Sequence, residues 1–118
     1  MGGLVIKGFL WVRPFMPERW VDGDTVHGLI DRGDGDLYRP IKGLRALFAD
    51  GSRFDTPEKA ERDRCEAARI SALQLMPPGV PVVSTSHELD VYGRPLCSFQ
   101  LPDGRDFATV MAEMGHLK

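Results

Sequence analysis

The chain has 118 residues, of which 15 are basic and 17 are acidic, and its formal net charge is -2 at pH 7. This balance excludes a general electrostatic attraction to polyanions, so any contact with nucleic acid needs a local basic patch or a bound cation. The length is that of one domain with its own hydrophobic core, and we predict a single domain over residues 1–118.

The cysteines and the N-terminal segment indicate the cellular compartment. Cys65 and Cys97 are too few and too far apart for a metal knuckle, and both are expected in the core of a reduced protein. The first apolar run is broken by Lys7 and followed by Arg13, so it lacks a signal-peptide core, and no later segment is apolar enough to span a membrane. We expect a cytoplasmic protein without a membrane partner. A phage-encoded protein in a bacterial host fits this setting.

Residues 4–54 have the composition of β-strands. The apolar run 4–12 and the Val-, Thr- and Ile-rich residues around the Asp-Gly turn at 22–23 predict strands. The intervening segment 13–20 contains two prolines and is interpreted as a packed connection. Its side chains suited to nucleic-acid contact are Arg13, Arg19 and Trp20.

An acidic segment, residues 31–36, separates these strands from the next one. It lacks the ligand spacing of a calcium loop and is interpreted as a solvated turn. Residues 38–48 predict a further strand, and residues 49–52 predict a turn.

A long helix is predicted from Thr56 to Met76, where a Pro-Pro-Gly sequence ends it. Pro57 suits the first turn of this helix, and Glu58 would face the positive end of its dipole. Small or apolar residues recur at helical spacing and should pack on the rest of the protein. These residues are Cys65, Ala68, Ala72 and Leu75.

The rest of the chain predicts two strands, within residues 80–86 and 92–101, and a short helix over 106–114 that ends at Gly115. Several strands, a helix, two strands and a helix follow one another in this order. That order fits an α+β fold with a small closed β-barrel and helices on one side better than an alternating parallel sheet.

Four segments that are weak signals separately become specific in combination and in this order. They are VDGDTV at 21–26, DTPE at 55–58, YGRPL at 92–96 and LPDGRDFATVMAEMGH at 101–116. With them the chain resembles the thermonuclease family, the staphylococcal-nuclease-like proteins, over roughly residues 20–117. The resemblance implies a five-stranded OB-type barrel with two packed helices. It also implies a Ca²⁺-dependent endonuclease or phosphodiesterase acting on DNA, with RNA left open as a second substrate.

The resemblance assigns the metal ligands by position. Asp24 and Asp55 would bind Ca²⁺ directly, the main-chain carbonyl of Thr56 would add a third oxygen, and Asp22 would support the site from one glycine away. These oxygen donors suit a hard divalent cation, which can supply the positive charge that the protein as a whole lacks.

The same resemblance assigns the catalytic and substrate-binding residues. Glu58 matches the general base that activates water, and Arg94 matches an arginine that binds the scissile phosphate. Tyr92 matches an aromatic residue that lies against the nucleotide. A half-buried strand position is the alternative interpretation of Tyr92.

The chain departs from the family pattern before the DTPE motif. The family places a second arginine five residues before the DTPE aspartate, whereas this chain has Asp50 there. Arg45 is the favoured equivalent, with a short insertion after its strand. Arg53, two residues before Asp55, is the alternative. Strand alternation does not decide between them, because the turn resets the register.

A second departure is at the C-terminus, where family members commonly continue into another helix and this sequence stops at Lys118. We therefore expect that helix to be missing and base contacts to be fewer. A homo-oligomer or a larger assembly would cover the surface left exposed. The three histidines have no zinc-like spacing and are interpreted as surface or turn residues. They are His27, His87 and His116.

Two further hypotheses belong to other functional classes. The first is a catalytically inactive OB-fold module that binds nucleic acid or protein, favoured by the displaced arginine and disfavoured by the retained acidic residues. The second is a structural component of a larger assembly, such as a phage particle.

Overall fold

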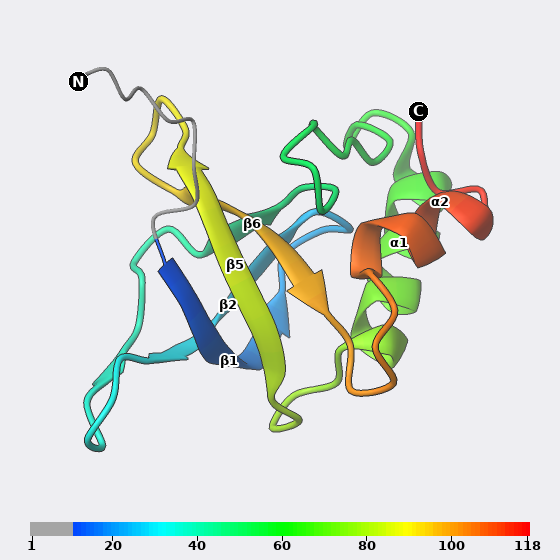
Figure 1. Ribbon diagram of the computed structural model, residues 1–118. Coiled ribbons are helices and arrows are strands. Elements are labelled where there is room, and N and C mark those ends of the chain that lie inside the picture. Colours follow the sequence, from blue (N-terminus) through cyan, green and yellow to red (C-terminus); the bar gives the residue numbers. More distant parts are fainter. Residues whose placement is uncertain (1–10) are drawn as a thin grey trace.

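Five strands close into a β-barrel in the computed structural model, which describes residues 11–118 (Figure 1). Their order is β1-β5-β6-β4-β2, and β1 closes the barrel because it pairs with both β5 and β2. The short β3 extends β2 beyond the barrel. The strands are β1 (Trp11–Trp20), β2 (Thr25–Asp31), β3 (Leu37–Tyr38), β4 (Leu44–Ala46), β5 (Val82–Leu89) and β6 (Pro95–Gln100). The helices are α1 (Arg62–Leu75) and α2 (Phe107–Glu113).

Strand β1 occupies the segment that the sequence suggested was a packed connection, so that interpretation is wrong. Most of the strand expected at 4–12 lies outside the described residues. Phe15, Pro17 and Trp20 are buried while the three residues between them are exposed, which is close to the alternation of a half-buried strand. The pairing register with β2 shifts between Pro17 and Arg19, and such an irregularity accommodates a residue without an N–H donor.

The predicted turn at 31–36 is confirmed, and it joins β2 to β3. The single strand predicted over 38–48 is wrong. Two short strands, β3 and β4, occur there, separated by a turn in which the Gly43 N–H donates to the Pro40 carbonyl at 3.2 Å. Gly43 has a φ of 77°, which favours glycine and interrupts an extended strand.

Helix α1 begins at Arg62 and not at Thr56, so the predicted start of the helix is wrong. Phe54, Thr56 and Pro57 are buried, and this burial holds the preceding segment against the barrel as an irregular loop. The predicted end and the predicted packing face are correct, since Ala68 and Ala72 are fully buried.

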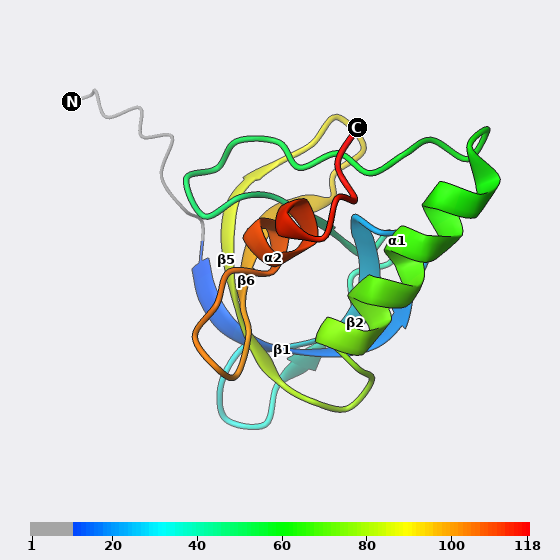
Figure 2. The same cartoon turned by 90° about the vertical axis from the view of Figure 1, so that its right-hand side faces the viewer.

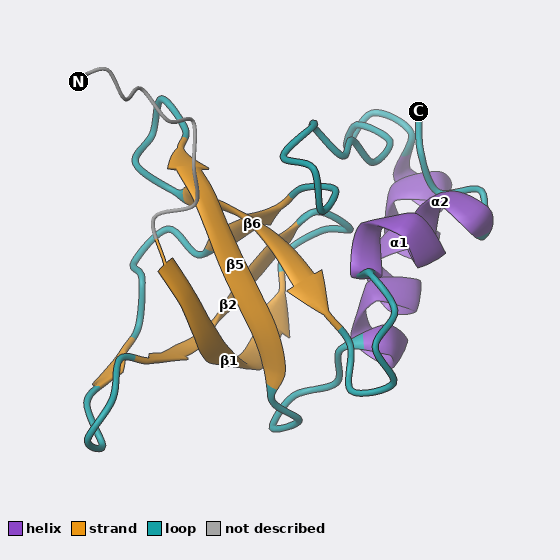
Figure 3. Ribbon diagram, viewed as in Figure 1, coloured by secondary structure: helices purple, strands orange, loops and turns teal. Residues whose placement is uncertain are grey.

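Both helices lie on the same side of the strands (Figure 3). The helix α2 crosses one end of the barrel, with α1 beside it (Figure 2). Phe107 of α2 packs against three aromatic side chains from β1, β6 and the loop before α1, and its ring centroid lies 5.0 to 6.1 Å from theirs. They are Trp20, Phe54 and Phe99. Asp106 caps the helix by accepting the Thr109 N–H at 3.0 Å.

The architecture is therefore α+β, an OB-type barrel with two packed helices, as the sequence predicted. Within residues 11–118, neither helix combines the length and the apolar character needed to cross a bilayer.

Candidate active site

A hairpin over residues 47–53 brings Arg45 and Asp55 together. Leu47 and Arg53 pair as an antiparallel bridge, and the Phe48 N–H donates to the Ser52 carbonyl at 3.0 Å. In an antiparallel pair, a residue two positions before one partner lies opposite the residue two positions after the other partner. Because Leu47 pairs with Arg53, Arg45 comes opposite Asp55. The Arg45 Nη2 lies 3.1 Å from Asp55 Oδ1. The hairpin thus leaves the residues on either side of it in register.

Arg53, the alternative candidate, is itself a residue of this hairpin, where it pairs with Leu47. Its side chain is exposed, and it does not line the pocket described below. Arg45 is instead largely buried, with 19 % of its side chain exposed. The structure therefore places Arg45, and not Arg53, among the acidic residues.

The turn between β1 and β2 supplies the second group of acidic residues. Asp24 accepts the Ala46 N–H of β4 through its main-chain carbonyl at 2.8 Å, which fixes the turn against the neighbouring strand. The Asp24 N–H donates to Asp22 Oδ1 at 3.0 Å. Asp24 Oδ2 lies 3.5 Å from Nη2 of Arg45. The carboxylates of Asp24 and Asp55 therefore converge on the same guanidinium nitrogen.

Gly23 allows this turn to approach the helix closely. A Cβ atom at Gly23 would lie 2.6 Å from Thr56 Cγ2 and 2.8 Å from the Cβ of Ala68. Both distances are shorter than van der Waals contact. The glycine in the Asp-Gly-Asp sequence thus serves close packing, and it holds Asp24 near Thr56.

We expect Gly23→Ala to destabilise the protein by about 1–3 kcal/mol, the usual cost of overpacking, as measured by urea unfolding. Thr56→Ser removes the Cγ2 methyl group and keeps the main-chain carbonyl, so it should recover part of that loss in the double variant. Equal stability of Gly23→Ala and the parent protein would show that the packing at Gly23 is not tight.

The Asp24 carboxyl is buried, with 8 % of the residue exposed. Burial, followed by the hydrogen bond and the negative charge of Asp22, raises the pKa of Asp24 to about 7, although Arg45 and the Thr25 hydroxyl act in the opposite direction. Burial also acts to raise the pKa of Asp22, but hydrogen bonds with Asp24 and Thr25 outweigh it and lower the pKa. The two acids therefore crowd negative charge into a buried turn, and additional positive charge would stabilise them.

These residues line one cavity of about 310 Å³. It is lined by six of the residues predicted from the sequence, which come from the β1–β2 turn, β4 and the loop before α1. They are Asp22, Asp24, Arg45, Asp55, Thr56 and Glu58. The remaining lining residues are Pro57, Lys59, Cys65 and Lys118.

Lys118 is a site residue that sequence reasoning missed. Its Nζ donates to Glu58 Oε1 at 2.7 Å, and its main-chain N–H lies 3.3 Å from the Asp55 carbonyl. The hydrogen bond from Lys118, and its positive charge, lower the pKa of Glu58. Glu58 itself is exposed and stands on the loop, not on the helix. Only the folding of the chain brings Lys118 to Glu58, and no sequence signal indicates it.

Arg94 and Tyr92 lie outside this cavity, in the turn between β5 and β6. The Arg94 Nε donates to Asp90 Oδ2 at 2.6 Å, and the guanidinium carbon lies 5.6 Å from the centre of the Tyr92 ring. Tyr92 is 65 % exposed, so the interpretation as a half-buried strand residue is wrong. Arg94 directly precedes β6, whose Leu96 pairs with Arg45 of β4. Arg94 therefore lies just before a strand that neighbours the strand of Arg45, but the structure does not bring Arg94 into the acidic pocket.

Two of the histidines differ from their interpretation as surface or turn residues. His27 lies on β2 and His87 on β5, and both are partly buried. The His87 Nε2 is hydrogen-bonded to Ser98 Oγ at 3.0 Å, and the His116 Nε2 to Ser71 Oγ at 2.8 Å. Neither pair lines the acidic pocket.

The donors of the pocket fit a hard cation in chemical type. Within residues 11–118, no group of three or more His, Cys, Asp or Glu side chains is arranged to hold a metal ion. Asp24 and Asp55 nevertheless converge, and the crowded pair formed by Asp24 and Asp22 would be stabilised by a positive charge. Two carboxylates and a main-chain carbonyl suffice for a cation that keeps water as part of its coordination.

Comparison of the chain with protein-family models gives no match, and comparison with curated proteins gives none either. The fold and the site together define the class to which the chain can be assigned: an OB-type barrel with an acidic pocket built around one largely buried arginine.

Proposed function

We propose that the protein is a Ca²⁺-dependent nuclease that hydrolyses phosphodiester bonds of DNA, with RNA as a further candidate substrate. The observation that carries the proposal is the convergence of Asp24 and Asp55 on Nη2 of Arg45, at 3.5 and 3.1 Å, in the cavity that also contains Glu58. An inactive binding module has no need of this combination of acids and arginine.

Asp24, Asp55 and the main-chain carbonyl of Thr56 would hold the cation. Asp22 would fix the position of Asp24 by accepting the Asp24 main-chain N–H. When bound, Ca²⁺ supplies positive charge beside the phosphate oxygens, where negative charge increases in the transition state.

Arg45 binds the phosphate in this proposal. Within residues 11–118, the hydrogen bond that Arg45 donates to a carboxylate comes from Nη2, so the N–H groups at Nε and Nη1 can donate to phosphate oxygens. A planar guanidinium can donate two parallel hydrogen bonds to one phosphate. Its burial beside Asp24 holds the group in place before substrate binds, which lowers the cost of ordering it.

Arg94 and Tyr92 would contact the substrate from the β5–β6 turn. Arg94 is held by Asp90 and directly precedes the strand that pairs with the strand of Arg45, so it can supply a second cation to the same phosphodiester. The exposed ring of Tyr92 provides a face for the sugar or the base. Arg53 takes no part in this scheme.

Glu58 takes the proton of the attacking water. Its lowered pKa means that it is ionised at neutral pH and can accept that proton. The water oxygen forms a bond to phosphorus, the bond from phosphorus to the leaving oxygen breaks, and the leaving oxygen takes a proton from solvent. Lys118 contacts the Glu58 carboxylate and holds an otherwise exposed side chain at the pocket.

The test is cleavage of plasmid and single-stranded DNA by purified protein with Ca²⁺ or with a chelator. We expect cleavage with Ca²⁺ only, and we expect Asp24→Asn to require a higher Ca²⁺ concentration, because one direct ligand becomes neutral. If Ca²⁺ produced no cleavage beyond that of a Glu58→Gln control, the proposal would be refuted.

A catalytically inactive OB-fold module is the second candidate. It is favoured by the bond between Arg94 and Asp90, which holds this arginine outside the pocket. Calorimetric titration with Ca²⁺ distinguishes the two candidates. Binding that Asp24→Asn weakens supports the nuclease, whereas no binding, or binding unchanged in Asp24→Asn, supports the module.

A further inference from the structure

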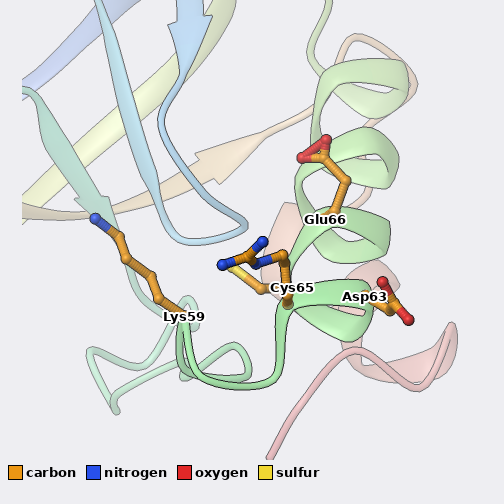
Figure 4. A pocket seen from close by; sticks show the side chains of 5 residues that line it. Lys59, Asp63, Cys65 and Glu66 are labelled. Atoms are coloured by element: carbon orange, nitrogen blue, oxygen red, sulfur yellow. The ribbon is translucent and has the colours of Figure 1, made fainter.

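A second, larger cavity of about 580 Å³ adjoins the candidate active site. It lies at the start of α1 (Figure 4) and is lined by Lys59, Arg62, Asp63, Cys65 and Glu66. Lys59 and Cys65 line both cavities. The two cavities are therefore neighbours along one surface, which runs from the β1–β2 turn past Glu58 to the first turns of the helix.

The positive charges of this second cavity are free to bind a ligand. The Glu66 carboxylate accepts hydrogen bonds from Arg69 at 2.6 and 2.8 Å, and Glu61 forms an ion pair with Arg64 at 2.6 Å. These pairs occupy the neighbouring acids, and within residues 11–118 neither Lys59 nor Arg62 makes an ion pair.

The remaining acid that lines the cavity is Asp63, which makes no ion pair within residues 11–118. The side chain of Asp63 points away from Lys59 and Cys65 (Figure 4). Lys59 and Arg62 are both exposed, so binding an anion would not require either to leave a buried partner. The cavity thus offers a phosphate two kinds of donor, the Lys59 ammonium and the Arg62 guanidinium.

We infer that this cavity is a second phosphate subsite, in which Lys59 and Arg62 bind a phosphate of the nucleic-acid strand next to the one being cleaved. The inference rests on the proposed function and specifies its substrate. A strand that places one phosphate beside Arg45 continues along the surface to Lys59 and Arg62. The preferred substrate is then a polynucleotide, and a dinucleotide with a single phosphodiester leaves the subsite empty.

The experiment measures binding of a labelled single-stranded oligodeoxynucleotide by fluorescence anisotropy, in chelator, over a series of salt concentrations. The double variant Lys59→Gln/Arg62→Gln should bind the oligonucleotide about tenfold more weakly than the parent protein. The slope of log K against log salt should become shallower by about 0.7 for each phosphate that the variant no longer neutralises. Affinity for the dinucleotide should change much less. The ratio of the affinity for the oligonucleotide to the affinity for the dinucleotide should therefore be smaller in the variant than in the parent protein.

The matched control is Arg64→Gln/Arg105→Gln, which removes two exposed positive charges outside both cavities. Equal affinity and equal salt slope in the two double variants would overturn the inference, because net charge alone would then explain the change. An equal loss of affinity for the dinucleotide would also overturn it, since Lys59 and Arg62 would then act on the first phosphate. These measurements need no cleavage, so a parent protein that binds as expected but does not cut DNA refutes only the proposed function.

Discussion

Glu58→Gln is expected to reduce Ca²⁺-dependent cleavage by about 100-fold to 10,000-fold, the usual contribution of a positioned general base. The amide has nearly the same shape as the carboxylate, but it cannot take the proton of the attacking water. Steady-state kinetics on single-stranded DNA would measure the loss, which should appear in kcat. Binding of DNA in chelator should stay close to that of the parent protein, because the exposed Glu58 side chain supports little of the fold.

Glu61→Gln is the matched control for this experiment. Glu61 is an exposed acid at the end of the same loop, it also pairs with a cation, and it does not line the active-site cavity. Its replacement should leave cleavage within about twofold of the parent protein, as is usual for surface substitutions. If Glu58→Gln and Glu61→Gln behaved alike, Glu58 would not be the base.

Arg45→Gln is expected to reduce cleavage by about 100-fold to 1,000-fold, which corresponds to the loss of about 2.7–4 kcal/mol of transition-state stabilisation. The guanidinium is the one cation that contacts both Asp24 and Asp55 among the described residues, and it is positioned there before substrate binds. Its removal also leaves a buried carboxylate without its positive partner. We therefore expect a lower free energy of unfolding in urea as well.

Arg53→Gln is the matched control for Arg45→Gln. It tests whether the loss of cleavage is specific to the arginine at position 45. Arg45 precedes the hairpin and Arg53 lies in it, and of these two arginines only Arg45 lines the pocket. Cleavage by Arg53→Gln should match the parent protein. A larger loss in Arg53→Gln than in Arg45→Gln would mean that the strand pairing of the hairpin differs when substrate is bound.

Each variant should be examined for both cleavage activity and free energy of unfolding, because some residues of the pocket contribute to both. Gly23 and Asp24 contribute to packing and to the site at once, whereas Glu58 is exposed and contributes mainly to the site. A loss of cleavage without a loss of stability is therefore expected for Glu58→Gln, and a loss of both is expected for Arg45→Gln.

The fold and much of the pocket could be predicted from the sequence because their signals are local. The strand and helix patterns in chain order indicated an α+β barrel, and the structure has that architecture. The Asp-Gly-Asp turn and the Asp-Thr-Pro-Glu segment carried most of the predicted acidic residues, and these share one cavity. Side chains close together in the sequence keep that proximity in the fold, whatever the tertiary packing.

The errors arose where burial outweighed local preference. Thr56 and Pro57 suit a helix start, yet packing against the barrel keeps them in a loop, and the helix begins at Arg62. The prolines of β1 suggested a connection. The alternate burial of Phe15, Pro17 and Trp20 instead makes that segment a strand, because the buried area outweighs the lost hydrogen bonds.

The sequence by itself determined which chemical groups are present: two aspartates separated by one glycine, an Asp and a Glu three residues apart, and arginines before and after them. Only the tertiary structure decided which arginine joins the acids. The bridge between Leu47 and Arg53 sets the register that brings Arg45 opposite Asp55. The packing of the segment after α2 brings Lys118 to Glu58. Both results depend on pairing between distant segments, which no local pattern specifies, because strand register and packing are set by the whole barrel.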